Sequence, residues 1–148
     1  RPLFGGDIGH GLARFLNVWA DRVLHAALIR LVIADILDHV DAADRNYFLE
    51  SRTARFGMTP TEIQTRSEDD IKAFGHAVST IKAALGEELF LGGDNPAYGD
   101  YIIFGAFAWA RSISEFSLLN ADDPVYNWRN RMLDMFDGIS RKSVGYEV

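Results

Sequence analysis

The chain contains no cysteine and few basic residues, and each shortage excludes a class of protein. Without cysteine it can form no disulfide framework, no thiolate zinc site and no cysteine nucleophile. It has 15 Lys and Arg against 21 Asp and Glu, which gives a formal net charge of −6. That balance argues against binding to nucleic acid, because a phosphate backbone is recognised by clustered cations.

Long apolar runs are also missing from the chain. The longest, residues 101–110, is well short of the roughly 18–20 residues that a membrane-spanning helix needs. The chain opens without a signal-peptide pattern, and the lack of cysteine fits a reducing compartment. We therefore expect a cytoplasmic protein that binds neither membrane nor nucleic acid.

The residues that are present are typical of one globular domain. A length of 148 residues with 48% apolar residues is sufficient for a hydrophobic core. Ten Phe, five Tyr and three Trp exclude a disordered chain, because so many large apolar groups must be buried.

The apolar residues recur at helical spacing, so we predict an all-α fold. From Leu12 they mark one face of a helix over about residues 8–40. Because this is long for a globular protein, we expect either a bend in it or a long helix-hairpin arm. Further helices are predicted near residues 42–56, 61–85 and 124–138. The start signals are Asp7, Asp41, Thr59-Pro60-Thr61-Glu62 and Asp123-Pro124, and the stop signals are Gly57, Gly86 and Gly138.

A further helix is predicted at the centre of the bundle, over about residues 98–113. Its segment 101–110 is apolar on every side, which indicates burial on every side. Asp100 stands at its start, where a carboxylate can accept hydrogen bonds from the free N–H groups. Gly99 and Gly105 are expected to let other backbones approach this helix closely.

The residues around Asp100 also carry a family resemblance. Residues 90–101, Phe-Leu-Gly-Gly-Asp-Asn-Pro-Ala-Tyr-Gly-Asp-Tyr, resemble the Gly-rich loop and sixth-helix start of glutathione transferases. Asp100 matches the aspartate of that family's N-capping box, whereas Ala97 stands where the family has Ser or Thr. The loss of one side-chain cap typically costs ~1 kcal/mol, so the helix start should depend more strongly on Asp100.

The resemblance extends over the whole chain. Arg1-Pro2-Leu3-Phe4 resembles the linker that follows the thioredoxin-like first domain, and residues 12–40 and 61–85 resemble the fourth and fifth helices. Residues 1–148 would then be the C-terminal helical domain, with the thioredoxin-like domain absent from this chain. A narrower resemblance, to the β-aryl-etherase and related fungal-type branch, rests on residues 44–57 and 122–138 and on Phe15, Leu16, Trp19, Arg30 and Asp35.

The resemblance implies a division of labour between two domains. The first domain would bind glutathione, the co-substrate, and supply the group that stabilises its thiolate, because a thiol with a pKa near 8.5 needs such help at pH 7. This chain alone would then hold no catalytic residue and no cofactor, and would be inactive. It would form one wall of the pocket for a hydrophobic electrophile, such as an aryl ether, and part of a homodimer interface.

By the same resemblance, the pocket wall would lie on the early fourth helix and the sixth helix. Phe15 and Trp19 are i, i+4 neighbours, with Arg22 beside them, and Phe107 and Arg111 are spaced in the same way. These five residues are the candidates for substrate contact. In the alternative interpretation the three aromatic residues are core, and Arg111 is a helix-dipole partner or half of a buried ion pair.

No metal site is predicted. The four histidines show no metal-ligand spacing, and the acidic groups near residues 35–41 are interpreted as a solvated helix end. Glu68-Asp69-Asp70 after Ser67 could mark a helix start, but is interpreted as a solvated face.

Two functions of other classes stay open at this point. The chain could be a non-catalytic binding or assembly module of the same fold. It could also be an unrelated helical ligand-binding bundle, an interpretation that rests on the central apolar helix alone.

Overall fold

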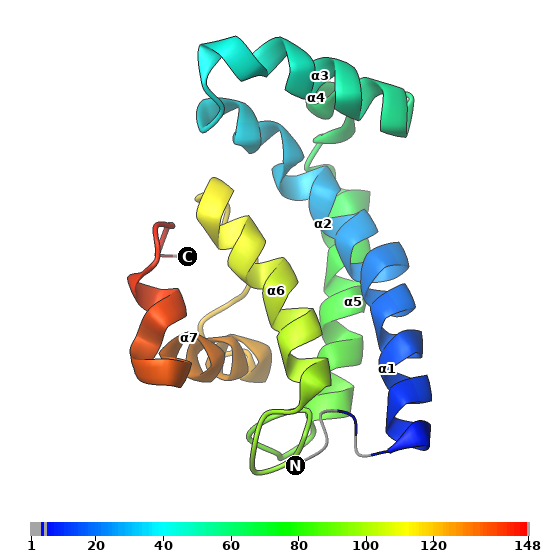
Figure 1. The fold of residues 1–148 in the computed structure, drawn as a ribbon, viewed down its shortest axis with the longest axis vertical. Helices are drawn as coiled ribbons and strands as arrows, with labels where there is room; N and C mark the ends of the chain where they lie inside the picture. The colour runs from blue at the N-terminus through cyan, green and yellow to red at the C-terminus, as the bar shows by residue number, and fades with distance from the viewer. Residues whose placement is uncertain (1–3, 5, 148) are drawn as a thin grey trace.

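A computed structural model describes residues 4 and 6–147, and the regular structure of this part of the chain is helical, which confirms the all-α prediction (Figure 1). The linker-like residues Arg1-Pro2-Leu3 lie outside the described residues. The elements are α1 (Asp7–Trp19), a π-helical turn (Ala20–Leu24), α2 (His25–Val32), a 3₁₀ segment (Ile33–Asp38), α3 (Ala42–Phe56), α4 (Pro60–Ile63), α5 (Glu68–Leu85), α6 (Tyr98–Ile113) and α7 (Pro124–Lys142).

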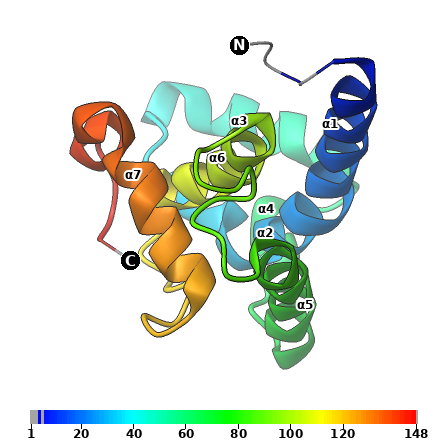
Figure 2. The ribbon, with the colours of Figure 1, turned by 90° about the horizontal axis from the view of Figure 1, so that it is seen from below.

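Helix α6 is the centre of the bundle. It contacts α1 and α2 on one side and α7 on the other, while α5 packs against α2 and α7 (Figures 1 and 2). The expected burial on every side is wrong, however, because Tyr101 and Gly105 are exposed. The buried residues of α6 are Asp100, Ile103, Phe104, Ala106, Phe107, Ala110 and Arg111.

The long first helix is interrupted, as expected, but neither Pro nor Gly marks the interruption. A π-helical turn separates α1 from α2, and the helix tightens to a 3₁₀ segment from Ile33. A π turn adds a residue to the helical repeat and so rotates the face that follows it. Accordingly α1 has no fully buried residue, whereas α2 buries Ala27, Leu28, Leu31 and Val32.

Two of the predicted helix starts are confirmed. Thr59 and Glu62 form a reciprocal capping box, in which Thr59 N donates to Glu62 Oε2 (2.8 Å) and Glu62 N to Thr59 Oγ1 (3.3 Å). The backbone N–H and the hydroxyl of Thr59 both donate to the Glu62 carboxylate and lower its pKa. The Asp123 carboxylate caps α7 by accepting from Val125 N (2.8 Å).

Two other starts differ from prediction. Asp7 lies within the first turn of α1 and is not its cap, because Gly6 occupies the cap position. Asp41 occupies the cap position of α3, but its side chain makes no capping hydrogen bond. Of the predicted stops, Gly57 and Gly86 end α3 and α5, and Gly57 has the left-handed φ of 74° that favours glycine.

The single helix predicted over residues 61–85 is wrong, because α4 ends at Ile63 and α5 begins at Glu68. A second capping box starts α5: Asp70 N donates to Ser67 Oγ (3.2 Å) and Ser67 N to Asp70 Oδ2 (3.1 Å). The interpretation of Asp70 as part of a solvated face is therefore also wrong. Its carboxylate is buried, because it joins the α5 start to another helix.

Gly138 does not end α7. The helix kinks there, with left-handed φ angles of 53° at Phe136, 57° at Asp137 and 70° at Gly138, and then continues to Lys142. The kink turns Phe136 out to solvent, so it does not belong to the apolar stripe of this helix. Val125, Trp128 and Met132 of that stripe are buried as expected.

The buried Asp70 should make stability depend on pH. Arg30 and Thr65 hydrogen-bond its carboxylate and hold its pKa well below the usual range. A depressed folded-state pKa stabilises the fold above the unfolded pKa of about 4, and this contribution is lost as pH falls through the folded value. We expect Asp70→Asn to lose about 2 kcal/mol of unfolding free energy at pH 7, with a smaller deficit near pH 2. Urea unfolding across this range checks it, with the exposed Asp69→Asn as control.

The two glycines of α6 should respond oppositely to alanine. A Cβ on Gly99 would lie 2.9 Å from Leu16 Cδ2 of α1, so Gly99→Ala must push that side chain away. A Cβ on Gly105 would meet nothing within 4 Å, which corrects the expectation of a close backbone approach there. We expect Gly105→Ala to stabilise the fold by about 0.5–1 kcal/mol through helix propensity, and Gly99→Ala to destabilise it. Equal shifts in the two unfolding midpoints would contradict this assignment.

Candidate functional site

The start of α6 is organised by one buried carboxylate. Asp100 is 0% exposed and accepts four hydrogen bonds. The donors are Leu91 N (2.7 Å), Gly92 N (3.0 Å), Ala97 N (2.9 Å) and Trp128 Nε1 (2.9 Å). The predicted cap at Asp100 is confirmed, and it also binds the preceding loop and α7.

Ala97 occupies the cap position of α6 and has no side-chain acceptor. The backbone supplies the missing half of the box, because Asp100 N donates to Ala97 O (3.0 Å). The loop is tight at this point: a Cβ on Gly92 would lie 2.6 Å from Asn95 O and 2.7 Å from Ala97 Cβ. Only glycine fits there without a shift of the backbone.

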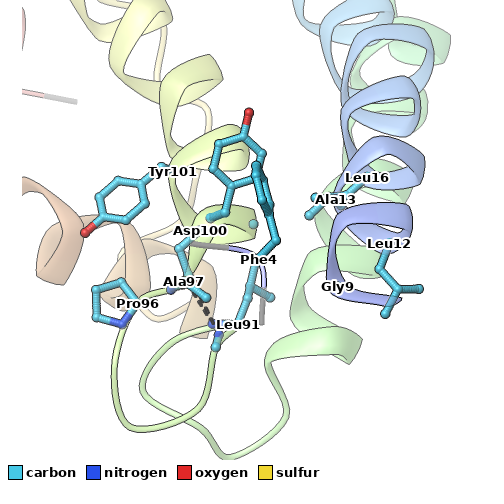
Figure 3. Close-up of a pocket in the computed structure, with 13 residues that line it drawn as sticks. Phe4, Gly9, Leu12, Ala13, Leu16, Leu91, Pro96, Ala97, Asp100 and Tyr101 are labelled. Atoms are coloured by element: carbon cyan, nitrogen blue, oxygen red, sulfur yellow. Dashed lines mark hydrogen bonds between the residues drawn. The ribbon is translucent and has the colours of Figure 1, made fainter. Parts of the chain in front are cut away.

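A groove of about 620 Å³ lies between α1 and the loop that leads into α6 (Figure 3). Phe4 stands between the two, with its ring edge-on to Tyr98 at a centroid distance of 4.8 Å. The groove is lined by Phe4, Gly9, Leu12, Ala13, Leu16, Leu91, Gly92, Pro96, Ala97, Tyr98, Gly99, Asp100 and Tyr101. It can hold an apolar or aromatic molecule.

None of the five residues predicted to contact substrate lines this groove. Phe15 lies on α1 but is 71% exposed, so its interpretation as a core residue is wrong. Trp19 is half-buried and packs against the core, and Arg22 is exposed. These three side chains lie outside the groove, because the side of α1 that faces the groove carries Leu12, Ala13 and Leu16.

Phe107 is a core residue, as the alternative interpretation had it. It is 2% exposed and makes edge-to-face contacts with Phe74 and Trp128, at centroid distances of 6.3 and 6.0 Å. A substrate contact at Phe107 is therefore not supported, because the side chain is enclosed by its neighbours.

Arg111 likewise acts within the protein. Its guanidinium is 6% exposed and forms an ion pair with Glu147 (NH2 to Oε1, 3.0 Å). It also donates to Ser143 O and Arg141 O, each at 3.2 Å, and so holds the C-terminal segment against α6. The ion-pair interpretation is confirmed, and substrate contact is not supported.

Most of the groove residues on α1 were not predicted as site residues. Leu12 and Leu16 were interpreted as part of a helix face, Leu16 also as part of the family resemblance, and Tyr98 as part of the loop, whereas Ala13 was not singled out. The available signal for this groove was Gly99, which directly precedes Asp100. A glycine in the first turn of a helix can mark the place where a side chain from another helix packs, as Leu16 does here. Within the described residues no group of His, Asp and Glu is arranged to hold a metal ion.

Comparisons with known proteins agree with this geometry. The family model for the glutathione S-transferase C-terminal domain matches residues 11–125. The chain therefore belongs to this family, and the alternative of an unrelated helical bundle is wrong. None of the helices described is long and apolar enough to cross a membrane.

A solved structure gives the same fold. It is the crystal structure of glutathione transferase GSTFuA3 from Phanerochaete chrysosporium, with a TM-score of 0.66 and 21% sequence identity. The match covers 93% of this chain and 53% of that one, so the chain spans about half the length of the enzyme that it resembles.

Asp100 should be the most sensitive polar residue of the site. Asp100→Ala would leave three backbone N–H groups and the buried Trp128 indole without their acceptor, and we expect a loss of at least about 3 kcal/mol in unfolding free energy. Denaturant unfolding followed by tryptophan fluorescence measures it. Asp94→Ala, at an exposed position in the same loop, is the control and should cost less than about 0.5 kcal/mol. A similarly small loss at Asp100 would show that it is not the organising cap.

Proposed function

We propose that this chain is the electrophile-binding domain of a glutathione transferase, which conjugates glutathione to hydrophobic electrophiles or uses it to cleave them. The groove beside the Asp100-capped start of α6 carries this proposal. Its lining is mostly apolar, which suits an electrophile poor in charge, and its volume suits a molecule of one or two aromatic rings.

The outer face of α1 supports the presence of a second domain. Ile8, Leu12 and Phe15 are 83%, 65% and 71% exposed, and their spacing places them on one face of the helix. An apolar face of this kind is costly in water and marks a contact surface. We propose that the thioredoxin-like domain of the parent enzyme covers it, and that this domain brings glutathione and its thiolate-stabilising group to the groove.

A finer assignment follows from the sequence resemblance. Aryl ethers of the kind cleaved in the etherase branch are planar and apolar, and the Tyr98 ring that lines the groove would pack against such a molecule. We propose this substrate class, with glutathione as co-substrate. A homodimer is proposed from the family, and a cytoplasmic location because glutathione keeps that compartment reducing.

A non-catalytic assembly module is the second candidate. The same exposed face of α1 favours it, since a partner protein could cover those side chains as well as a domain of the same chain could. The two functions differ in one respect, because only the enzyme needs the groove to remain open to a small molecule.

Groove filling tests the proposed function. In the parent protein that carries a thioredoxin-like domain, we expect glutathione-dependent turnover of an aryl electrophile, and Ala13→Leu should lower kcat/KM about tenfold by occupying the groove. Ala54→Leu, exposed on α3, is the matched control and should leave kcat/KM unchanged. Absence of turnover would overturn the enzymatic function and leave the assembly module. If Ala13→Leu left turnover unchanged, the substrate site would have to lie outside this groove.

The isolated chain gives a complementary measurement. We expect no heat of binding when it is titrated with an S-alkyl glutathione, because the glutathione site is proposed to lie on the other domain. Binding to this chain alone would contradict that division of the site.

A further inference from the structure

Three arginines gather at the end of α6 that lies away from the groove. Arg111 comes from the last turn of α6, and Arg129 and Arg141 come from the two halves of α7. Two of them have carboxylate partners among the described residues: Arg111 pairs with Glu147, and Arg141 pairs with Asp134 (Nε to Oδ1, 2.5 Å). The hydrogen bonds that Arg141 donates to the Asp134 carboxylate raise the pKa of Arg141.

Arg129, the third, has no such partner in the described part of the chain. It is 4% exposed, and its Nε is enclosed without a hydrogen-bond acceptor. The ring of Tyr126 lies under the guanidinium, 4.6 Å from Cζ to the ring centroid, and gives only partial compensation. Burial lowers the pKa of Arg129, and the charges of Arg111 and Arg141 act in the same direction, whereas Tyr126 and Glu147 act against it.

A buried cation without a partner is rare, because desolvating a charge is far more costly than one aromatic contact can offset. Three guanidinium groups share this region with the carboxylates of Asp134 and Glu147, which leaves one positive charge uncompensated. The cluster therefore combines an excess of positive charge with an enclosed donor that has no acceptor.

From this arrangement we infer an anion-binding site, in which Arg129, with Arg111 and Arg141 beside it, binds one small carboxylate from solution. The planar guanidinium matches the two oxygens of a carboxylate in a bidentate geometry. The enclosure of Arg129 restricts the ligand to a small anion. One negative charge also balances the cluster.

This site is separate from the groove. Asp100 and Arg111 stand near opposite ends of α6, about 16 Å apart along its axis at 1.5 Å per residue. A ligand at the arginines would stabilise the junction of α6, α7 and the C-terminal segment, which Arg111 already holds through backbone carbonyls. Its effect should therefore appear in stability and should not require glutathione or a second domain.

Thermal unfolding with formate as the probe tests the proposal. With sodium held constant by exchange for the bulkier gluconate, we expect the wild-type Tm to rise by about 3 °C between about 1 and about 100 mM formate. Arg129→Met should lose this response. Arg131→Met is the matched control, because Arg131 lies on the same helix and donates to Leu89 O, and it should keep the response.

Two further measurements keep the test independent of the folding of one variant. In wild-type protein the ¹⁵N resonance of Arg129 Nε, identified by its loss in Arg129→Lys, should shift as formate is added. Glu147→Gln should strengthen the formate response about threefold, because it removes a competing carboxylate. An equal rise in Tm for wild type and Arg129→Met, or an Nε resonance that does not move, would overturn the proposal.

Discussion

The buried carboxylate of Asp100 is the interaction on which the functional end of the molecule depends. A fully buried charge is tolerated only when its lone pairs are used, and here four N–H donors from three parts of the chain use them. The same bonds fix the loop after Phe90, the first turn of α6 and the position of Trp128 on α7. Because that loop forms one side of the groove, the shape of the groove depends on the hydrogen bonds that the Asp100 carboxylate accepts.

The other side of the groove comes from a helix that the fold does not bury. The π-helical turn rotates the apolar face, so α2 belongs to the core while Ile8, Leu12 and Phe15 of α1 stay in solvent. Leu16 reaches α6 because Gly99 leaves room for it, and this contact closes the inner edge of the groove. A surface of this kind gains stability only from a further domain or partner, which is consistent with the two-domain function proposed for it.

Local chemistry could be predicted from the sequence, and non-local packing could not. The caps at Thr59, Asp100 and Asp123 were correct because the capping bond of each joins residues no more than three positions apart. The further bonds of Asp100 to Leu91, Gly92 and Trp128 are longer in range and were not predicted. Asp70 was misread because its partner Arg30 is forty residues away, and three adjacent acidic residues suggest solvent when taken alone. Phe15 and Phe107 both lie on apolar helix faces, yet Phe15 is exposed and Phe107 is enclosed. The periodicity of apolar residues predicts which face of a helix is apolar, but not which other element packs against that face.

The two ends of α6 show how differently one helix can treat charge. At its start a carboxylate lies among N–H groups, and at its last turn a guanidinium lies among carbonyl groups, so both charges also favour the helix dipole. The balance is complete at Asp100, where every donor comes from the chain itself. At the other end Arg129 adds a second buried charge, which the described residues do not pair. At the start of α6 the hydrogen bonds of the buried charge are all made within the protein, whereas at its other end one buried positive charge has no partner in the part of the chain that the structure describes. An anion from solution would therefore bind near Arg129 without disturbing the bonds of Asp100.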